Sequence, residues 1–129
     1  MCLDKVDEVT KEYTEGYKIF TVRGNFVSPE FFNTYKKFPL QEWIEDESDY
    51  NIWYDNCTYY SHYKSGFHFF VNLEDAYEWM GDSTIDCGIF KIQVRNIVAS
   101  GKQRLYGIVK SKNAKVGVAK EMYIEEEVT

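Results

Sequence analysis

The sequence predicts an α+β fold, a mostly antiparallel sheet of about five strands with one short helix. Three segments support this prediction. Residues 16–23 alternate between two faces and are rich in β-branched and aromatic side chains, as in a strand. Residues 89–95 alternate in the same way, with a basic outer face. Between them, residues 73–80 repeat apolar side chains at helical spacing, which makes this helix the best-supported element.

The signals at both ends of the 73–80 segment agree with a helix. Asn72 stands at the N-cap position, and two acidic residues follow in the first turn, where the helix dipole favours negative charge. Gly81 is placed to end the helix. The apolar stripe consists of Leu73, Ala76, Tyr77 and Met80.

The other elements follow from local patterns. Ser28 and Pro29 could open a second short helix over residues 29–36. Residues 45–65 are aromatic-rich but aperiodic, which indicates an irregular loop that leads into an edge strand. Further expected elements are strands at 66–71, 105–110 and 116–124, a turn at 99–102 and a connection at 111–115.

The chain divides into an arm and a domain. Residues 1–15 are polar and acidic without a clear period, which predicts a loosely ordered acidic arm. Residues 16–129 are expected to form a single α+β domain, because 129 residues suit one ordinary core.

Cysteine usage and hydropathy exclude several classes of protein. The three cysteines are far apart and odd in number, and neither His62 nor His68 stands at zinc-ligand spacing from them. We therefore expect no disulfide framework, no metal and no cofactor. No apolar run approaches 18 residues, so we expect a soluble, cytoplasmic protein without a membrane partner.

No catalytic residue can be assigned from a motif. Ser100-Gly101-Lys102 resembles the end of a phosphate-binding loop but lacks its first glycine and its magnesium-binding hydroxyl. His68 lies between phenylalanines, and no nucleophile or orienting carboxylate is singled out for it. A binding protein is therefore expected in preference to an enzyme.

Charge is segregated along the chain. The net charge is −6, yet residues 87–120 contain eight bases and no acid. Between Lys37 and Lys64 there are six acids and no base. The two segments therefore predict surfaces of opposite sign.

The acidic segment is also rich in Trp and Tyr, side chains enriched at interfaces. A solvated acidic face is the simplest interpretation. A sharper hypothesis is a surface that imitates a nucleic-acid strand and docks in the basic groove of a host protein or ribonucleoprotein complex. The predicted partner-binding residues are Glu42, Trp43, Glu45, Asp46, Glu47, Asp49, Tyr50, Trp53, Tyr54, Asp55, Tyr59 and Tyr60.

The basic strands offer an alternative function. Residues 91–115 could bind nucleic acid directly, with Tyr106 as a stacking ring. Two considerations weigh against it: the whole chain is acidic, and outward lysines are a common way to protect sheet edges from aggregation.

From Gly16 to about Glu125 the chain resembles a group of small phage and prophage proteins of uncharacterised function. The resemblance is carried by Gly-Tyr-Lys-Ile-Phe at 16–20, Phe-Pro-Leu-Gln-Glu-Trp-Ile at 38–44, Lys-Ser-Gly-Phe-His-Phe at 64–69 and Val-Ala-Lys-Glu-Met-Tyr-Ile at 118–124. It implies an origin in a mobile element, and small acidic proteins of that origin include inhibitors of host defence such as anti-CRISPR proteins. It carries no catalytic residue.

A fainter similarity is to NAD-using ADP-ribosyltransferases, through Gly66 to Phe69 before a helix with Ala76 and Tyr77. That resemblance implies a first-strand contact to NAD from Lys18 or Arg23 and a catalytic Glu121 or Glu125. The spacing departs from the family pattern, and the first-strand His or Arg is not matched at Lys18.

Overall fold

The computed structural model describes residues 3–23, 26–29, 37–55, 60–81, 87–105 and 112–128, with the backbone alone at 23, 26–29, 53–55 and 60–61. The elements in chain order are β1 (Lys5–Val6), β2 (Glu15–Arg23), β3 (Phe26–Pro29), β4 (Phe38–Pro39), β5 (Trp43–Glu45), β6 (Asn51–Asp55), β7 (Tyr60–Lys64), β8 (Phe67–Phe70), α1 (Leu73–Met80), β9 (Cys87–Leu105) and β10 (Lys112–Glu127).

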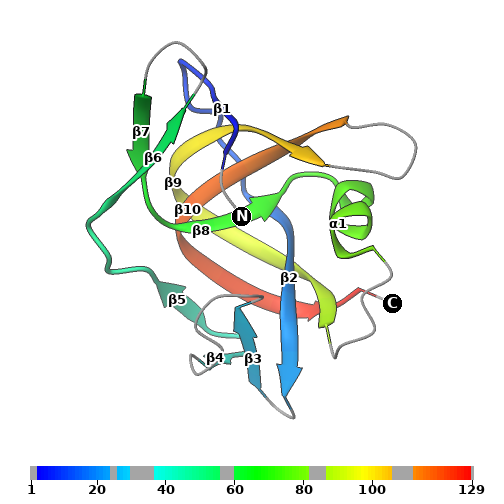
Figure 1. The fold of residues 1–129 in the computed structure, drawn as a ribbon. Helices are drawn as coiled ribbons and strands as arrows, with labels where there is room; N and C mark the ends of the chain where they lie inside the picture. Colours follow the sequence, from blue (N-terminus) through cyan, green and yellow to red (C-terminus); the bar gives the residue numbers. More distant parts are fainter. Residues whose placement is uncertain are drawn as a thin grey trace.

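The predicted fold class is confirmed. Within the described residues, an antiparallel sheet of eight strands is joined by a separate hairpin of β6 and β7, with α1 beside the sheet (Figure 1). Four of the strands form a ring, because β2 pairs with β9, β9 with β10, β10 with β8, and β8 again with β2. The long, curved strands β9 and β10 are two of the four strands of this ring (Figure 1).

Two hydrophobic clusters lie on the two faces of the curved sheet. One gathers Ile19, Phe70 and Val118 under α1, and the other gathers Phe20, Phe69 and Ile92. The Phe69 ring lies over two glycines of the neighbouring strands: a Cβ would come within 2.3 Å of this ring at Gly16 and within 2.4 Å at Gly117. A larger side chain at either position would collide with a fully buried ring.

Helix α1 spans the predicted residues. Gly81 follows it with φ of 57°, and its amide donates to the Tyr77 carbonyl. Asn72 stands at the N-cap, but its side chain makes no capping bond within the described part of the chain. The apolar stripe is corrected at one position, because Tyr77 is 45% exposed while Trp79 packs against Phe70.

The predicted turn at 99–102 is wrong, because these residues continue β9 in register with β10. Gly101 serves close packing here: a Cβ on it would lie 1.9 Å from the Lys5 carbonyl oxygen of β1. Ser100 is fully buried and donates its hydroxyl to Asp7. Turn-forming residues therefore occur inside a strand because the N-terminal arm packs against them.

The described part of the arm, residues 3–15, is attached to the sheet. β1 pairs with β9, Leu3 is 1% exposed, and the amides of Asp4 and Asp7 donate to carbonyls of β9. The polar composition of the arm indicated a loosely ordered segment. Composition could not indicate these contacts, because the partners lie almost a hundred residues away in sequence.

The remaining sequence predictions fare differently. The strand at 116–124 is confirmed within the longer β10, which also takes up residues 112–115 of the expected connection. The irregular loop expected at 45–65 is corrected: Glu45 ends β5, and residues 51–55 and 60–64 pair as the β6–β7 hairpin, because alternate residues of both strands find cross-strand partners. The expected helix at 29–36 and strand at 105–110 lie mostly outside the described residues, and Pro29 itself ends β3.

Candidate functional site: the acidic aromatic surface

Strand β5 fixes the first half of the predicted partner-binding segment against the sheet. It pairs with β10, with Trp43 opposite Tyr123 and Glu45 opposite Glu121. Further hydrogen bonds continue the attachment: the Asp46 amide donates to the Lys120 carbonyl at 2.8 Å, and Lys120 Nζ donates to the Ser48 carbonyl at 2.7 Å. Ile44 packs inward on the second hydrophobic cluster. Because neighbouring side chains of a strand point to opposite faces, Trp43 and Glu45 project outward.

The carboxylates of this segment remain largely available. Glu42, Glu45 and Glu47 are exposed, and no ion pair to them is found among the described residues. Asp49 instead pairs with Lys64 at 2.9 Å, and this hydrogen bond lowers the pKa of the Asp49 carboxyl. Asp46 accepts hydrogen bonds from the amide and hydroxyl of Ser48.

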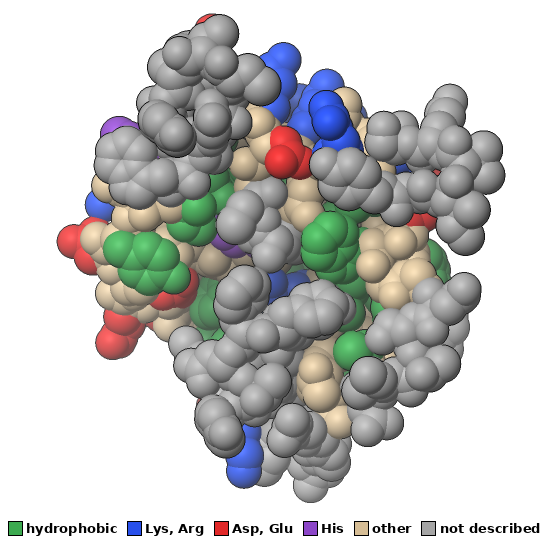
Figure 2. All heavy atoms as spheres, viewed as in Figure 1, with side chains coloured by type: hydrophobic (Ala, Val, Ile, Leu, Met, Phe, Trp, Pro, Cys, Tyr) green, Lys and Arg blue, Asp and Glu red, His purple; other side chains and the backbone are tan. Residues whose placement is uncertain are grey.

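Rings are exposed beside these acids. Trp43 is 40% and Tyr50 61% exposed. In Figure 2, acidic side chains and an exposed hydrophobic side chain gather on the left, over β5 and the chain that follows it. Trp53, Tyr54, Asp55 and Tyr60 lie in the β6–β7 hairpin, where only the backbone is described, and Tyr59 lies outside the described residues.

Sheet pairing adds residues that sequence reasoning missed. Tyr123 contacts Trp43 with ring centroids 5.7 Å apart. Arg95 of β9 stacks on the Trp43 ring, with its guanidinium carbon 3.8 Å from the ring centroid. The same guanidinium pairs with Glu121 at 3.0 Å. Asn96 also donates to Glu121. In β10, Glu121 and Tyr123 on the exposed face alternate with buried Met122 and Ile124, a pattern that could have indicated the outward pair, but no local pattern indicates that β5 pairs beside them.

We call this set the acidic aromatic surface. It consists of Glu42, Trp43, Glu45, Glu47, Tyr50, Glu121 and Tyr123.

His68 lies in a buried hydrogen-bond chain. Its Nε2 lies 2.9 Å from the Tyr63 hydroxyl, which in turn accepts the Leu3 amide at 3.0 Å, and its Nδ1 lies 3.2 Å from the Gly66 carbonyl. A neutral ring protonated on Nδ1 satisfies every group in this chain. Burial, with a smaller effect from nearby Lys18, lowers the pKa of His68 to about 3. The histidine is therefore a neutral structural group that ties the arm to β7 and β8.

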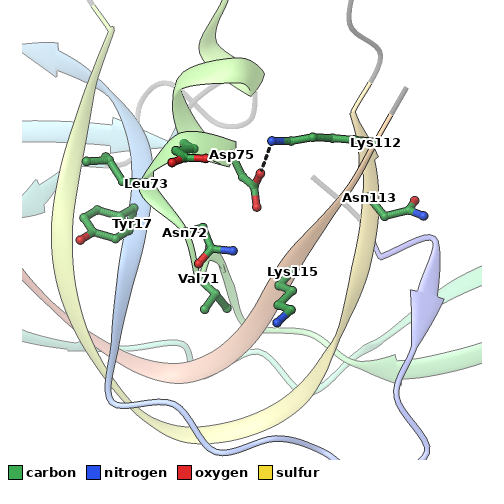
Figure 3. A pocket seen from close by; sticks show the side chains of 9 residues that line it. Tyr17, Val71, Asn72, Leu73, Asp75, Lys112, Asn113 and Lys115 are labelled. Atoms are coloured by element: carbon green, nitrogen blue, oxygen red, sulfur yellow. Dashed lines mark ion pairs between the residues drawn. The ribbon is translucent and has the colours of Figure 1, made fainter. Parts of the chain in front are cut away.

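A pocket of about 690 Å³ opens where α1 and β10 begin (Figure 3). Lys112 crosses it to Asp75 at 3.0 Å and reaches Glu78 at 2.8 Å, and these bonds raise the pKa of Lys112. Among the side chains that the structure describes, none of the predicted partner-binding residues lines this pocket.

The residues implied by the ADP-ribosyltransferase resemblance do not line this pocket. Glu121 is bound by Arg95 and Asn96, and Glu125 accepts from Gln93 at 2.6 Å. Lys18 donates to the His68 carbonyl at 2.6 Å. The described residues also contain no cluster of side chains that could hold a metal ion.

Comparisons with protein-family models, with curated proteins and with solved structures found no match to this chain. In the part of the chain that the structure describes, no helix has the length and apolar character needed to cross a bilayer.

Proposed function

We propose that this chain is a small inhibitory binding protein that docks its acidic aromatic surface in the basic groove of a host defence or nucleic-acid-processing complex. The observation that carries the proposal is the position of Trp43. Its exposed ring stands between exposed Glu42 and Glu45 on a strand that is hydrogen-bonded to β10. An anti-CRISPR-like activity in the bacterial cytoplasm is the form of inhibition that the phage resemblance favours.

Spaced carboxylates beside flat rings suit a groove that normally holds nucleic acid. Arginine and lysine side chains in such grooves bind phosphates and stack on bases, and they can bind carboxylates and aromatic rings in the same way. Attachment to β10 orders the surface before binding, so less conformational entropy is lost on association. Arg95 stacked on Trp43 already shows that this ring accepts a guanidinium.

The test is a pull-down from bacterial lysate with matched variants. The wild-type chain should capture a partner at about 50 mM salt and release it at about 1 M, because screening weakens charge-steered binding. The double variant Glu45→Gln, Glu47→Gln should retain about tenfold less partner, a loss equivalent to about 1.4 kcal/mol. The control Glu8→Gln, Glu12→Gln removes the same charge from exposed residues of the arm and should match the wild type.

A second pair of variants isolates the rings. Tyr50→Ala should weaken capture, whereas Tyr77→Ala, an equally drastic change at an exposed tyrosine of α1, should not. The captured complex should then process its nucleic-acid substrate more slowly when purified chain is added. Equal retention of the partner at both salt concentrations, or by both charge variants, would contradict the proposal.

A further inference from the structure

Three lysines from three strands stand in one row on the sheet. Lys5 of β1 is the register partner of Lys102 of β9, and Lys102 is the register partner of Lys115 of β10. Directly opposite residues of antiparallel strands project to the same face, and all three side chains are exposed. We call Lys5, Lys102 and Lys115 the lysine row. Exposed Arg104 lies two residues further along β9.

No ion pair with an acidic side chain of the described residues neutralises the lysines of the row. Ion pairs there join Lys64, Lys91, Arg95 and Lys112 to acids, but none involves the lysine row or Arg104. Two carboxylates beside the row make other contacts: Asp4, next to Lys5 in the chain, accepts the Arg104 backbone amide, and Asp75, which lines the same pocket as Lys115, is bound to Lys112. Glu74 lines that pocket as well. Like charges directly opposite one another destabilise a sheet. The like charges of the row therefore destabilise the sheet, and no ion pair within the described residues offsets this cost.

Protection of a sheet edge could explain Lys5 of the edge strand β1, but it does not explain Lys102 or Lys115. At Lys102, β9 is paired on one side with β1 and on the other with β10. At Lys115, β10 is paired with β9, and on its other side the Lys115 carbonyl accepts the Val71 amide at 3.1 Å. Both lysines therefore lie on strands that are bonded on both sides, where no free edge needs a charge to block it.

We propose that the lysine row binds the phosphate backbone of a nucleic acid. Strands of a sheet lie about 4.8 Å apart, so the row places three ammonium groups along about 10 Å. Consecutive phosphates of one DNA strand are separated by about 3.4 Å along the helix axis, so this length faces about three of them. Figure 2 shows basic side chains gathered at the top of the view beside one acidic side chain, whereas several other acidic side chains lie on the left.

The expected binding is weak, independent of sequence and strongly dependent on salt. Because the row consists of lysines alone, its expected contacts to DNA are contacts to phosphates. Three such contacts to a duplex give a slope of about −2.7 in a plot of log binding constant against log salt concentration. The row is distinct from the acidic aromatic surface, so this proposal does not rest on the proposed function.

The test uses the purified chain and fluorescently labelled 20-nucleotide DNA, as duplex and as single strand, with anisotropy measured from about 20 to 200 mM salt. Lys102→Ala should weaken binding several-fold and bring the slope closer to zero by about 0.9. The control Lys91→Ala removes the same charge from the same strand at a lysine already paired with Glu15, and it should leave the slope unchanged.

Three outcomes would overturn the proposal. They are absence of binding at about 20 mM salt, equal effects of the two lysine variants, and a binding constant that does not depend on salt. Sedimentation of the chain alone tests the alternative that the row binds a second copy of the chain. Self-association that Lys102→Ala abolishes, without any binding of DNA, would assign the row to the acidic surface of a second copy and would also overturn the proposal.

Discussion

The two ends of β9 carry bases in opposite electrostatic surroundings. At one end, Lys91 pairs with Glu15 at 3.4 Å and Arg95 pairs with Glu121 at 3.0 Å. At the other end, Lys102 is flanked in register by Lys5 and Lys115. By composition, bases occur along the whole strand. In the folded sheet, the bases at one end lie beside acids, whereas those at the other end lie beside further bases. Among the described residues of β9, the bases without an ion pair, Lys102 and Arg104, lie at the second end.

Lowering the pH should have the largest effect on stability, because it acts on His68 in the buried hydrogen-bond chain that holds the arm and, with it, Lys5 of the lysine row. Unfolded His68 takes up a proton near pH 6.5, whereas the folded chain keeps it neutral down to a pKa of about 3. The free energy of unfolding should therefore fall as pH falls through this window, by about 1.4 kcal/mol per pH unit and about 5 kcal/mol over the whole of it. Urea unfolding at pH values between 7.5 and 4 measures the slope.

The control for this prediction is His68→Gln. It should be less stable than the wild type at neutral pH but should lose little stability between pH 6.5 and 5, where carboxyl groups titrate little. Equal slopes for both proteins in that interval would show that His68 is not the responsible group.

Gly101→Ala should detach the arm and remove Lys5 from the lysine row. The new Cβ would meet the Lys5 carbonyl oxygen at 1.9 Å, so β1 must move. We expect a loss of about 1–3 kcal/mol in the free energy of unfolding. Hydrogen exchange should accelerate at the amides of Asp4 and Asp7, which donate to β9. Lys102→Ala, which adds no atom to this contact, should leave that exchange unchanged.

A double-mutant cycle should measure how much the Arg95–Trp43 stack contributes at the end of β9 whose bases are paired with acids. Arg95→Ala and Trp43→Ala each remove the stack, and their coupling should be about 0.5–1 kcal/mol, as for exposed cation–π pairs. Raised salt should reduce the separate contribution of Arg95 to binding Glu121. Strict additivity of the two changes in unfolding free energy would show that the stack contributes nothing.

Lys102→Glu is expected to have the smallest effect, and its sign is opposite to that of most substitutions. A carboxylate between Lys5 and Lys115 replaces two like-charge pairs by two opposite-charge pairs. The unfolding free energy should rise by about 0.2–1 kcal/mol at low salt and by less at high salt. Arg104→Glu lies opposite uncharged Asn113 and should gain less. Equal changes for the two variants would contradict the register argument.

Local patterns predicted the elements whose stability depends on near neighbours. Helix α1 was predicted residue for residue, because its period, its acidic first turn and Gly81 all lie within ten residues. Strand β2 was likewise predicted from its alternation. Ser100 and Gly101 misled the prediction because their type indicates a turn, while their role is to admit a strand and a carboxylate from the arm.

The candidate site was predicted only in its linear part. Glu42 to Tyr50 were identified from charge and aromatic content, whereas Glu121, Tyr123 and Arg95 join them only because β5 pairs with β10 and β10 with β9. The lysine row likewise needed β1, which composition assigned to a loose arm.

The sequence by itself determined the α+β class, helix 73–80 and the separation of acidic from basic segments, since these depend on periodicity and composition over short stretches. Tertiary structure alone decided which charges meet. Strand register sets partners a few ångströms apart that lie tens of residues apart in the chain. The bases of β9 are therefore neutralised at Arg95 and left unpaired, among the described residues, at Lys102.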